Sequence, residues 1–71
     1  MYVYKRLREV RVAMEKSQEE IARILNMTRQ QYGLYESGRR ELPMRHFVTL
    51  ARFYYVTLDY LAGLSDSPRG Y

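Results

Sequence analysis

The sequence predicts a small all-α domain of five short helices, and three observations support that prediction. The chain has 71 residues and no cysteine, so one compact domain has to be stabilised by packing without disulfide bonds. Apolar residues recur every three or four positions in several segments, which is the period of a helix. Three of these segments follow a Ser or Thr, the residue types that cap the N-termini of helices.

The first helix is expected over residues 2 to 14. Four apolar residues of this segment are separated by four, three and four positions, so they share one side of a helix. These residues, which we expect to face the core, are Val3, Leu7, Val10 and Met14.

The second helix is expected to begin after Ser17. The Ser17 hydroxyl can accept a hydrogen bond from the N–H of Glu20, while the Glu20 carboxylate accepts one from the N–H of Ser17. The apolar side of this helix consists of Ile21, Ala22, Ile24 and Leu25. Asn26, a residue type that tolerates the left-handed backbone conformation, is expected to end it.

The third helix is expected to begin only two residues later, after Thr28. A second capping box is expected here, in which the Gln31 side chain accepts a hydrogen bond from the N–H of Thr28. On a helical wheel Tyr32 and Tyr35 lie on the side of Thr28, so their rings are expected to face the core. The opposite side presents a polar surface with one aliphatic group, which is suited to contact another molecule. That surface comprises Arg29, Gln30, Gly33, Leu34 and Ser37.

The fourth and fifth helices complete the predicted domain. Gly38 is expected to cap the third helix, and Pro43 stands in the first turn of the fourth, where its missing N–H costs nothing. The apolar side of the fourth helix consists of Phe47, Leu50, Ala51 and Tyr54. Thr57 is expected to cap a fifth helix that ends near residue 63 or 64. We therefore predict a domain over residues 1–64 and a flexible tail over residues 65–71.

Composition excludes several classes of function. Twelve Lys and Arg against eight Asp and Glu give a net charge of +4, which favours a polyanionic partner without identifying it. One histidine and no cysteine indicate no metal site, and no cofactor is expected. Glu19 and Glu20 are adjacent and diverge by about 100° on a helix, and His46 has no evident catalytic partner, so an enzyme is not expected. No apolar run is long enough to cross a membrane, and no signal peptide is evident, which predicts a cytoplasmic protein without a membrane partner.

Several segments, in their order and spacing, resemble the phage repressor and Cro family of helix-turn-helix proteins, also called the XRE family. The matching segments are LREVR (7–11), SQEEIA (17–22), TRQQY (28–32), YESGRRELP (35–43), LA (50–51) and LDYL (58–61). The resemblance covers roughly residues 5 to 64. It implies a repressor-like domain of five helices, the third of which enters the major groove of double-stranded DNA.

Carried over by position, the resemblance implies roles for individual residues. Base edges would be contacted by Thr28, Arg29, Gln30 and Leu34. The helical wheel places nearly the same residues on the outward side. Their chemistry also fits this role, because Arg can bind guanine, Gln can bind adenine and Leu can cover a thymine methyl. Phosphates would be contacted by Gln18, Gln31, Ser37, Arg39, Arg40 and Arg45. A buried pair of Arg11 and Glu36 would tie the first helix to the third.

The function expected from these residues is a sequence-specific transcriptional regulator, a repressor acting as a homodimer on a palindromic operator. The expected dimer interface comprises Tyr60, Leu61 and Leu64, although Leu61 could equally close the core of the monomer. The alternative is an antitoxin or protein-interaction module that uses the same fold to contact a protein. Binding of DNA fragments at low salt distinguishes the two.

The chain departs from the family pattern at positions that concern the backbone. Glu15 and Lys16 stand where many members have a glycine and an apolar residue, and Asn26 replaces the usual glycine of the turn. Tyr55 stands where Asn or Gly commonly ends the fourth helix. An aromatic residue is disfavoured in a left-handed cap, so either this cap is absent or its strain is tolerated.

Overall fold

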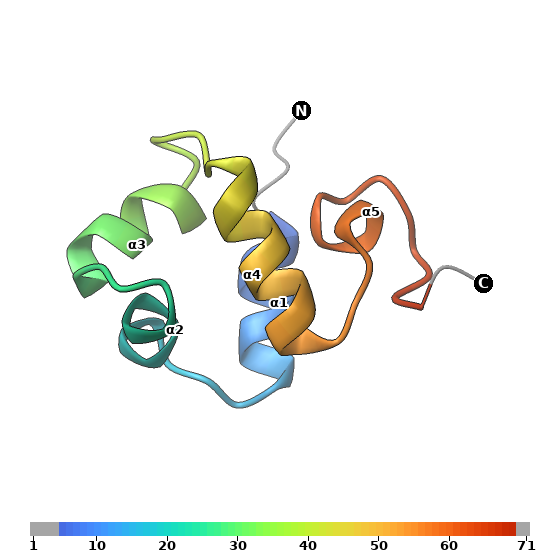
Figure 1. The fold of residues 1–71 in the computed structure, drawn as a ribbon, viewed down its shortest axis with the longest axis horizontal. Helices are drawn as coiled ribbons and strands as arrows, with labels where there is room; N and C mark the ends of the chain where they lie inside the picture. Colours follow the sequence, from blue (N-terminus) through green and yellow to red (C-terminus); the bar gives the residue numbers. More distant parts are fainter. Residues whose placement is uncertain (1–4, 70–71) are drawn as a thin grey trace.

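The computed structural model describes residues 5–69, and within them it contains five α-helices and no strand (Figure 1). The helices are α1 (Lys5–Ala13), α2 (Gln18–Ile24), α3 (Arg29–Glu36), α4 (Met44–Tyr54) and α5 (Leu58–Leu61). In the view of Figure 1, α1 and α4 overlap in the middle of the molecule, with α2 and α3 on one side and α5 on the other. The predicted all-α class and the order of the helices are confirmed.

Both predicted capping boxes are present, and they set where α2 and α3 begin. The N–H of Glu20 donates to Ser17 Oγ over 3.0 Å, and the N–H of Ser17 donates to Glu20 Oε1 over 2.9 Å. At α3 the N–H of Gln31 donates to Thr28 Oγ1 over 3.1 Å, and the N–H of Thr28 donates to Gln31 Oε1 over 3.0 Å. Each box satisfies N–H groups that have no partner within the helix, so both helix starts are fixed locally.

The core draws residues from every helix. The largest fully buried side chains are those of Leu7, Ile21, Tyr32, Leu50 and Leu61. Two residues that the sequence predicts to be apolar core are instead exposed: Met14 to 46% and Ile24 to 38%. α1 ends at Ala13, one residue before Met14, so Met14 lies in the turn that follows and not on the apolar side of the helix. Val3 lies outside the described residues.

Residues 65–69, predicted to be part of a flexible tail, lie against the domain in this structure. Arg6 Nη1 donates to the carbonyl of Ser65 over 3.2 Å, and the N–H of Thr57 donates to the carbonyl of Pro68 over 2.9 Å. These bonds connect the segment to α1 and to the link between α4 and α5. The flexibility of the tail and the domain boundary at residue 64 stay predictions.

Among the described residues 5–69, three that are not glycine adopt the left-handed conformation. The φ angles are 57° for Glu15, 59° for Asn26 and 64° for Tyr55. Asn26 ends the second helix region as predicted, and Asn is among the residues that tolerate this conformation. Tyr55 does form the left-handed cap of α4, so of the two possibilities raised by the sequence the strained cap is the one observed.

Candidate nucleic-acid interface

Helix α3 turns its tyrosines inward and a polar face outward. Tyr32 is fully buried, and Tyr35 is partly buried against the core cluster. The residues expected to contact bases are exposed, except that Leu34 is half-buried; these residues are Thr28, Arg29, Gln30 and Leu34. The orientation predicted by the helical wheel is therefore confirmed. It leaves a guanidinium, an amide and an aliphatic side chain available to another molecule.

Gln18, at the start of α2, connects this face to the interior of the domain. Arg29 Nη1 donates to Gln18 Oε1 over 3.0 Å, and Gln18 Nε2 donates to Glu36 Oε1 over 3.1 Å. Because the Glu36 carboxylate can only accept, it fixes which end of the Gln18 amide faces inward. The amide oxygen of Gln18 must then face Arg29.

Arg11 and Glu36, expected as a buried pair, form a two-bonded ion pair between α1 and α3. Arg11 Nε donates to Glu36 Oε2, and Arg11 Nη2 donates to Glu36 Oε1, both over 2.9 Å. Glu36 is only 4% exposed. Burial by itself would raise the pKa of Glu36, but hydrogen bonds from Arg11 and Gln18 outweigh it and hold that pKa below its usual value. The pair thus sets the position of α3 relative to α1.

The loop after α3 presents two arginines at the same end of the molecule. Gly38, with φ of 82°, turns the chain, and the N–H groups of Arg39 and Arg40 donate to the carbonyl of Leu34 over 2.9 and 3.1 Å. Both arginine side chains are exposed, and within residues 5–69 they form no ion pair. They are free to approach phosphates. The Ser37 hydroxyl instead donates to the carbonyl of Leu34 over 3.1 Å. To donate to a phosphate, Ser37 would first have to break this hydrogen bond.

Gln31 and Arg45 come together at a hollow between α3 and α4. Its volume is about 380 Å³, and both residues line it together with Asn26 and His46. Gln31 uses its Oε1 atom in the capping box, so its Nε2 donor stays available. Burial, followed by the charge of Arg45, lowers the pKa of His46. The His46 imidazole lies beside the two expected phosphate ligands, and its lowered pKa disfavours a positive charge there.

Sequence reasoning missed the contact between Gln18 and Arg29 and the place of His46 in this hollow. Both depend on how side chains from different helices meet. The available signal was positional: Gln18 and Arg29 are each the first residue of a helix, and these helices pack closely. Periodicity within one helix cannot show such a contact.

The expected dimer interface is altered by the structure. Leu61 is fully buried, because it closes the core beneath α5, and its side chain cannot meet a partner. Tyr60 is partly covered by the guanidinium of Arg6, which lies 4.2 Å from the ring centroid. Leu64 is 67% exposed and stays accessible. Leu61 thus fills the other role considered for it, closing the core of the monomer, and the dimer interface itself stays a prediction.

Two further features are absent from residues 5–69. No helix in this part of the chain is both long and apolar enough to cross a bilayer. Nor do these residues contain a group of three or more His, Cys, Asp or Glu side chains arranged to hold a metal ion.

Comparison with known proteins identifies the family. The helix-turn-helix family model matches residues 7–61. The chain is similar to the uncharacterized HTH-type transcriptional regulator YobD of Bacillus subtilis (strain 168), with 38% identity over 63 residues. That match covers 89% of this chain and 56% of YobD, so the chain spans about half the length of this curated relative. No solved structure matches it. With five helices in the expected order and a family match over most of its length, the chain belongs to the XRE-type helix-turn-helix family.

Proposed function

We propose that this chain is a transcriptional regulator that binds double-stranded DNA in a sequence-specific manner. The observation that carries the proposal is the outward face of α3, where Arg29 and Gln30 are exposed while Tyr32 is buried behind them. The similarity to a protein named as a transcriptional regulator supports it. The exposed arginines of the loop after α3 add positive charge beside that face.

In this proposal α3 lies in the major groove. Arg29 donates to the O6 and N7 atoms of guanine, Gln30 pairs with adenine, and Leu34 covers a thymine methyl, with Thr28 at the edge. Phosphate contacts from Arg39, Arg40, Arg45, Gln31 and Ser37 fix the register of the helix on the duplex. Gln18 reaches a phosphate only with its second N–H, because its first is donated to Glu36.

We further propose a homodimer that represses transcription. One domain of this size contacts few base pairs, so useful specificity needs two half-sites about 34 Å apart. Two-fold symmetry of the protein then requires a palindromic operator. Occupying such an operator is sufficient to block transcription, without catalysis, a metal or a cofactor, and the proposed location is the cytoplasm.

Selection of bound sites from random DNA duplexes tests the proposal. The expected result is an enriched motif with two inverted half-sites whose centres are one helical turn apart. A single half-site without symmetry would overturn the homodimer and leave the DNA reader intact. Absence of any enriched motif, together with no measurable binding to duplex DNA at low salt, would overturn the proposed function itself.

A further inference from the structure

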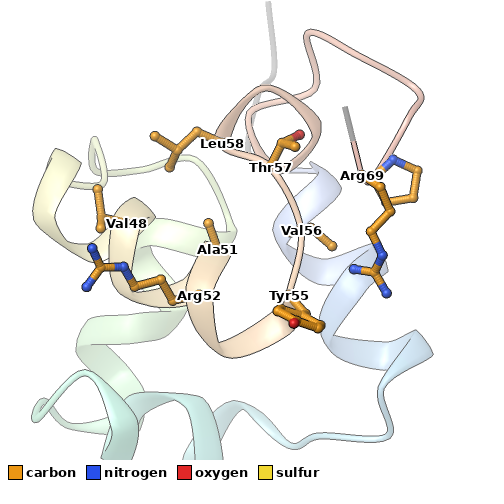
Figure 2. Close-up of a pocket in the computed structure, with 9 residues that line it drawn as sticks. Val48, Ala51, Arg52, Tyr55, Val56, Thr57, Leu58 and Arg69 are labelled. Carbon is orange, nitrogen blue, oxygen red and sulfur yellow. The ribbon is translucent and has the colours of Figure 1, made fainter. Parts of the chain in front are cut away.

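A groove lies between α4, α5 and residues 68–69, away from the proposed DNA-reading face. Its volume is about 730 Å³ (Figure 2). In Figure 1 α5 lies at the opposite end of the molecule from α3, the helix that begins with Arg29 and Gln30. The proposed contact with DNA leaves this groove open.

The floor of the groove is apolar and partly exposed. Ala51 is buried, Val48 and Val56 are half-buried, and Leu58 is 41% exposed. Tyr55 projects at its edge with 79% of its surface exposed. Single apolar side chains on a surface are ordinary, whereas several that line one concave surface are typical of a binding site.

Two arginines flank this floor without acidic partners. Arg52 and Arg69 lie on opposite sides of the groove in the view of Figure 2, with Tyr55 between them. Within the described part of the chain neither forms an ion pair, and the Arg69 guanidinium instead lies 5.2 Å from the centroid of the Tyr55 ring. No Asp or Glu lines the groove. Its charge therefore favours an acidic occupant.

We propose that the groove binds an acidic amphipathic peptide segment of another protein. Apolar side chains of the peptide pack on Val48, Ala51 and Leu58, and its carboxylates accept charge-assisted hydrogen bonds from Arg52 and Arg69. An extended peptide can direct one carboxylate to each of the two arginines, which lie on opposite sides of the groove. The apolar strip also continues beyond the groove to Met44, which is 67% exposed and stands one helical turn before Val48.

A second copy of this chain suits the groove less well. A copy that docked through the same face would bring its own Arg52 and Arg69 to the contact, and the chain already carries a net charge of +4. Like charges placed together across an interface oppose association. An acidic partner removes this repulsion and leaves α3 free, so DNA and peptide can be bound together.

Selection of displayed peptides that bind the 71-residue chain tests the proposal. Random dodecapeptides are selected in the presence of excess duplex DNA, which occupies the basic surface around α3 and removes peptides that only imitate DNA. The enriched sequences are expected to combine Asp or Glu with Leu, Phe or Met. The best of them is then synthesised with a fluorescein label, and its dissociation constant is measured by fluorescence anisotropy.

The variants Arg52→Glu and Arg69→Glu are each expected to weaken peptide binding at least tenfold. Arg23→Glu, the same charge change at an exposed arginine of α2, is expected to leave it unchanged. A peptide whose acids are replaced by Asn and Gln should also bind at least tenfold more weakly. Circular dichroism checks that each variant is folded, and Arg52→Gln and Arg69→Gln replace any that is not.

Three results would overturn the proposal. The first is that no peptide, or only neutral and basic peptides, is enriched. The second is that the best peptide binds the Arg52 and Arg69 variants as tightly as the unmodified chain. The third is that duplex DNA displaces the peptide, which would place its site on the reading face. None of these results depends on whether the chain regulates transcription.

Discussion

Arg29, the first residue of α3, donates a hydrogen bond to Gln18, the first residue of α2, over 3.0 Å. Gln18 is itself oriented by Glu36, which is buried and paired with Arg11. An exposed guanidinium at the proposed DNA surface is thus connected through one side chain, that of Gln18, to an ion pair in the interior. A flexible side chain that is held in one orientation before binding loses less entropy when it binds.

Replacing Gln18 by Ala should therefore relax sequence preference at one base pair. Arg29 would lose the acceptor that orients it, so discrimination at its base should fall by up to the roughly 1–3 kcal/mol that a bidentate base contact provides. The measurement is binding-site selection with wild type and variant, in parallel with Arg29→Ala. Both variants should lose preference at the same position of the motif.

The two roles considered for Gln18 give different results in that experiment. If Gln18 served only as a phosphate ligand, its removal would weaken binding to all sequences alike and leave the motif unchanged. Gln30→Ala serves as the matched control, because it should relax a different position. An unchanged motif for Gln18→Ala beside a relaxed one for Arg29→Ala would refute the positioning role.

The ion pair of Arg11 and Glu36 should make stability depend on acid pH. The pKa of Glu36 lies below its ordinary value of 4.5, so its carboxylate stabilises the fold above that pH. This contribution is lost as the pH falls through the lowered pKa of the folded state. Urea unfolding between pH 7 and pH 3 should thus show a decline in the free energy of unfolding.

The variant Glu36→Gln isolates this contribution. At pH 7 it should be less stable by roughly 3 kcal/mol, the low end of the range for breaking a buried pair, because the amide oxygen still accepts from Arg11. Its stability should fall less steeply with acid than that of wild type. Glu20, whose pKa is also lowered, is retained in both proteins and so cancels from the comparison. Equal slopes for the two proteins would contradict the assignment.

Local chemistry explains which parts of the structure the sequence could predict. The boxes at Ser17 and Thr28 consist of residues three positions apart, so their bonds are encoded within one turn, and they fixed two helix starts. The exposure of Met14 depended on where α1 ends, which the apolar spacing alone does not determine. Burial of Leu61 and the contact of Gln18 with Arg29 arise from packing between helices. Periodicity within one helix does not show such packing, and the sequence indicates only that Gln18 and Arg29 each begin a helix.

Tyr55 is held in a conformation that costs an L-amino acid roughly 1–2 kcal/mol, and Asn relieves part of that cost. We therefore expect Tyr55→Asn to raise the free energy of unfolding by about 1 kcal/mol or less, measured in urea at neutral pH. The control is Arg52→Asn, because the backbone of Arg52 lies inside α4. This variant should have a slightly lower free energy of unfolding than wild type, since Asn is a poorer helix former than Arg. A loss of stability in Tyr55→Asn would show that contacts of the ring outweigh the strain.

The exposed loop arginines should act on DNA affinity through charge alone. Each arginine that neutralises one phosphate contributes about 0.9 to the slope of log K against log salt concentration. Arg39→Ala and Arg40→Ala should each weaken binding to every duplex and lower that slope by about one, without changing the selected motif. The measurement is a titration of one labelled duplex at several salt concentrations.

The control variant is Arg52→Ala, which removes the same charge from the groove beside α5. Its slope of log K against log salt concentration should equal that of wild type. If Arg52→Ala lowered the slope while Arg39→Ala did not, DNA would lie against α4 and α5, and the placement of α3 in the major groove would be wrong.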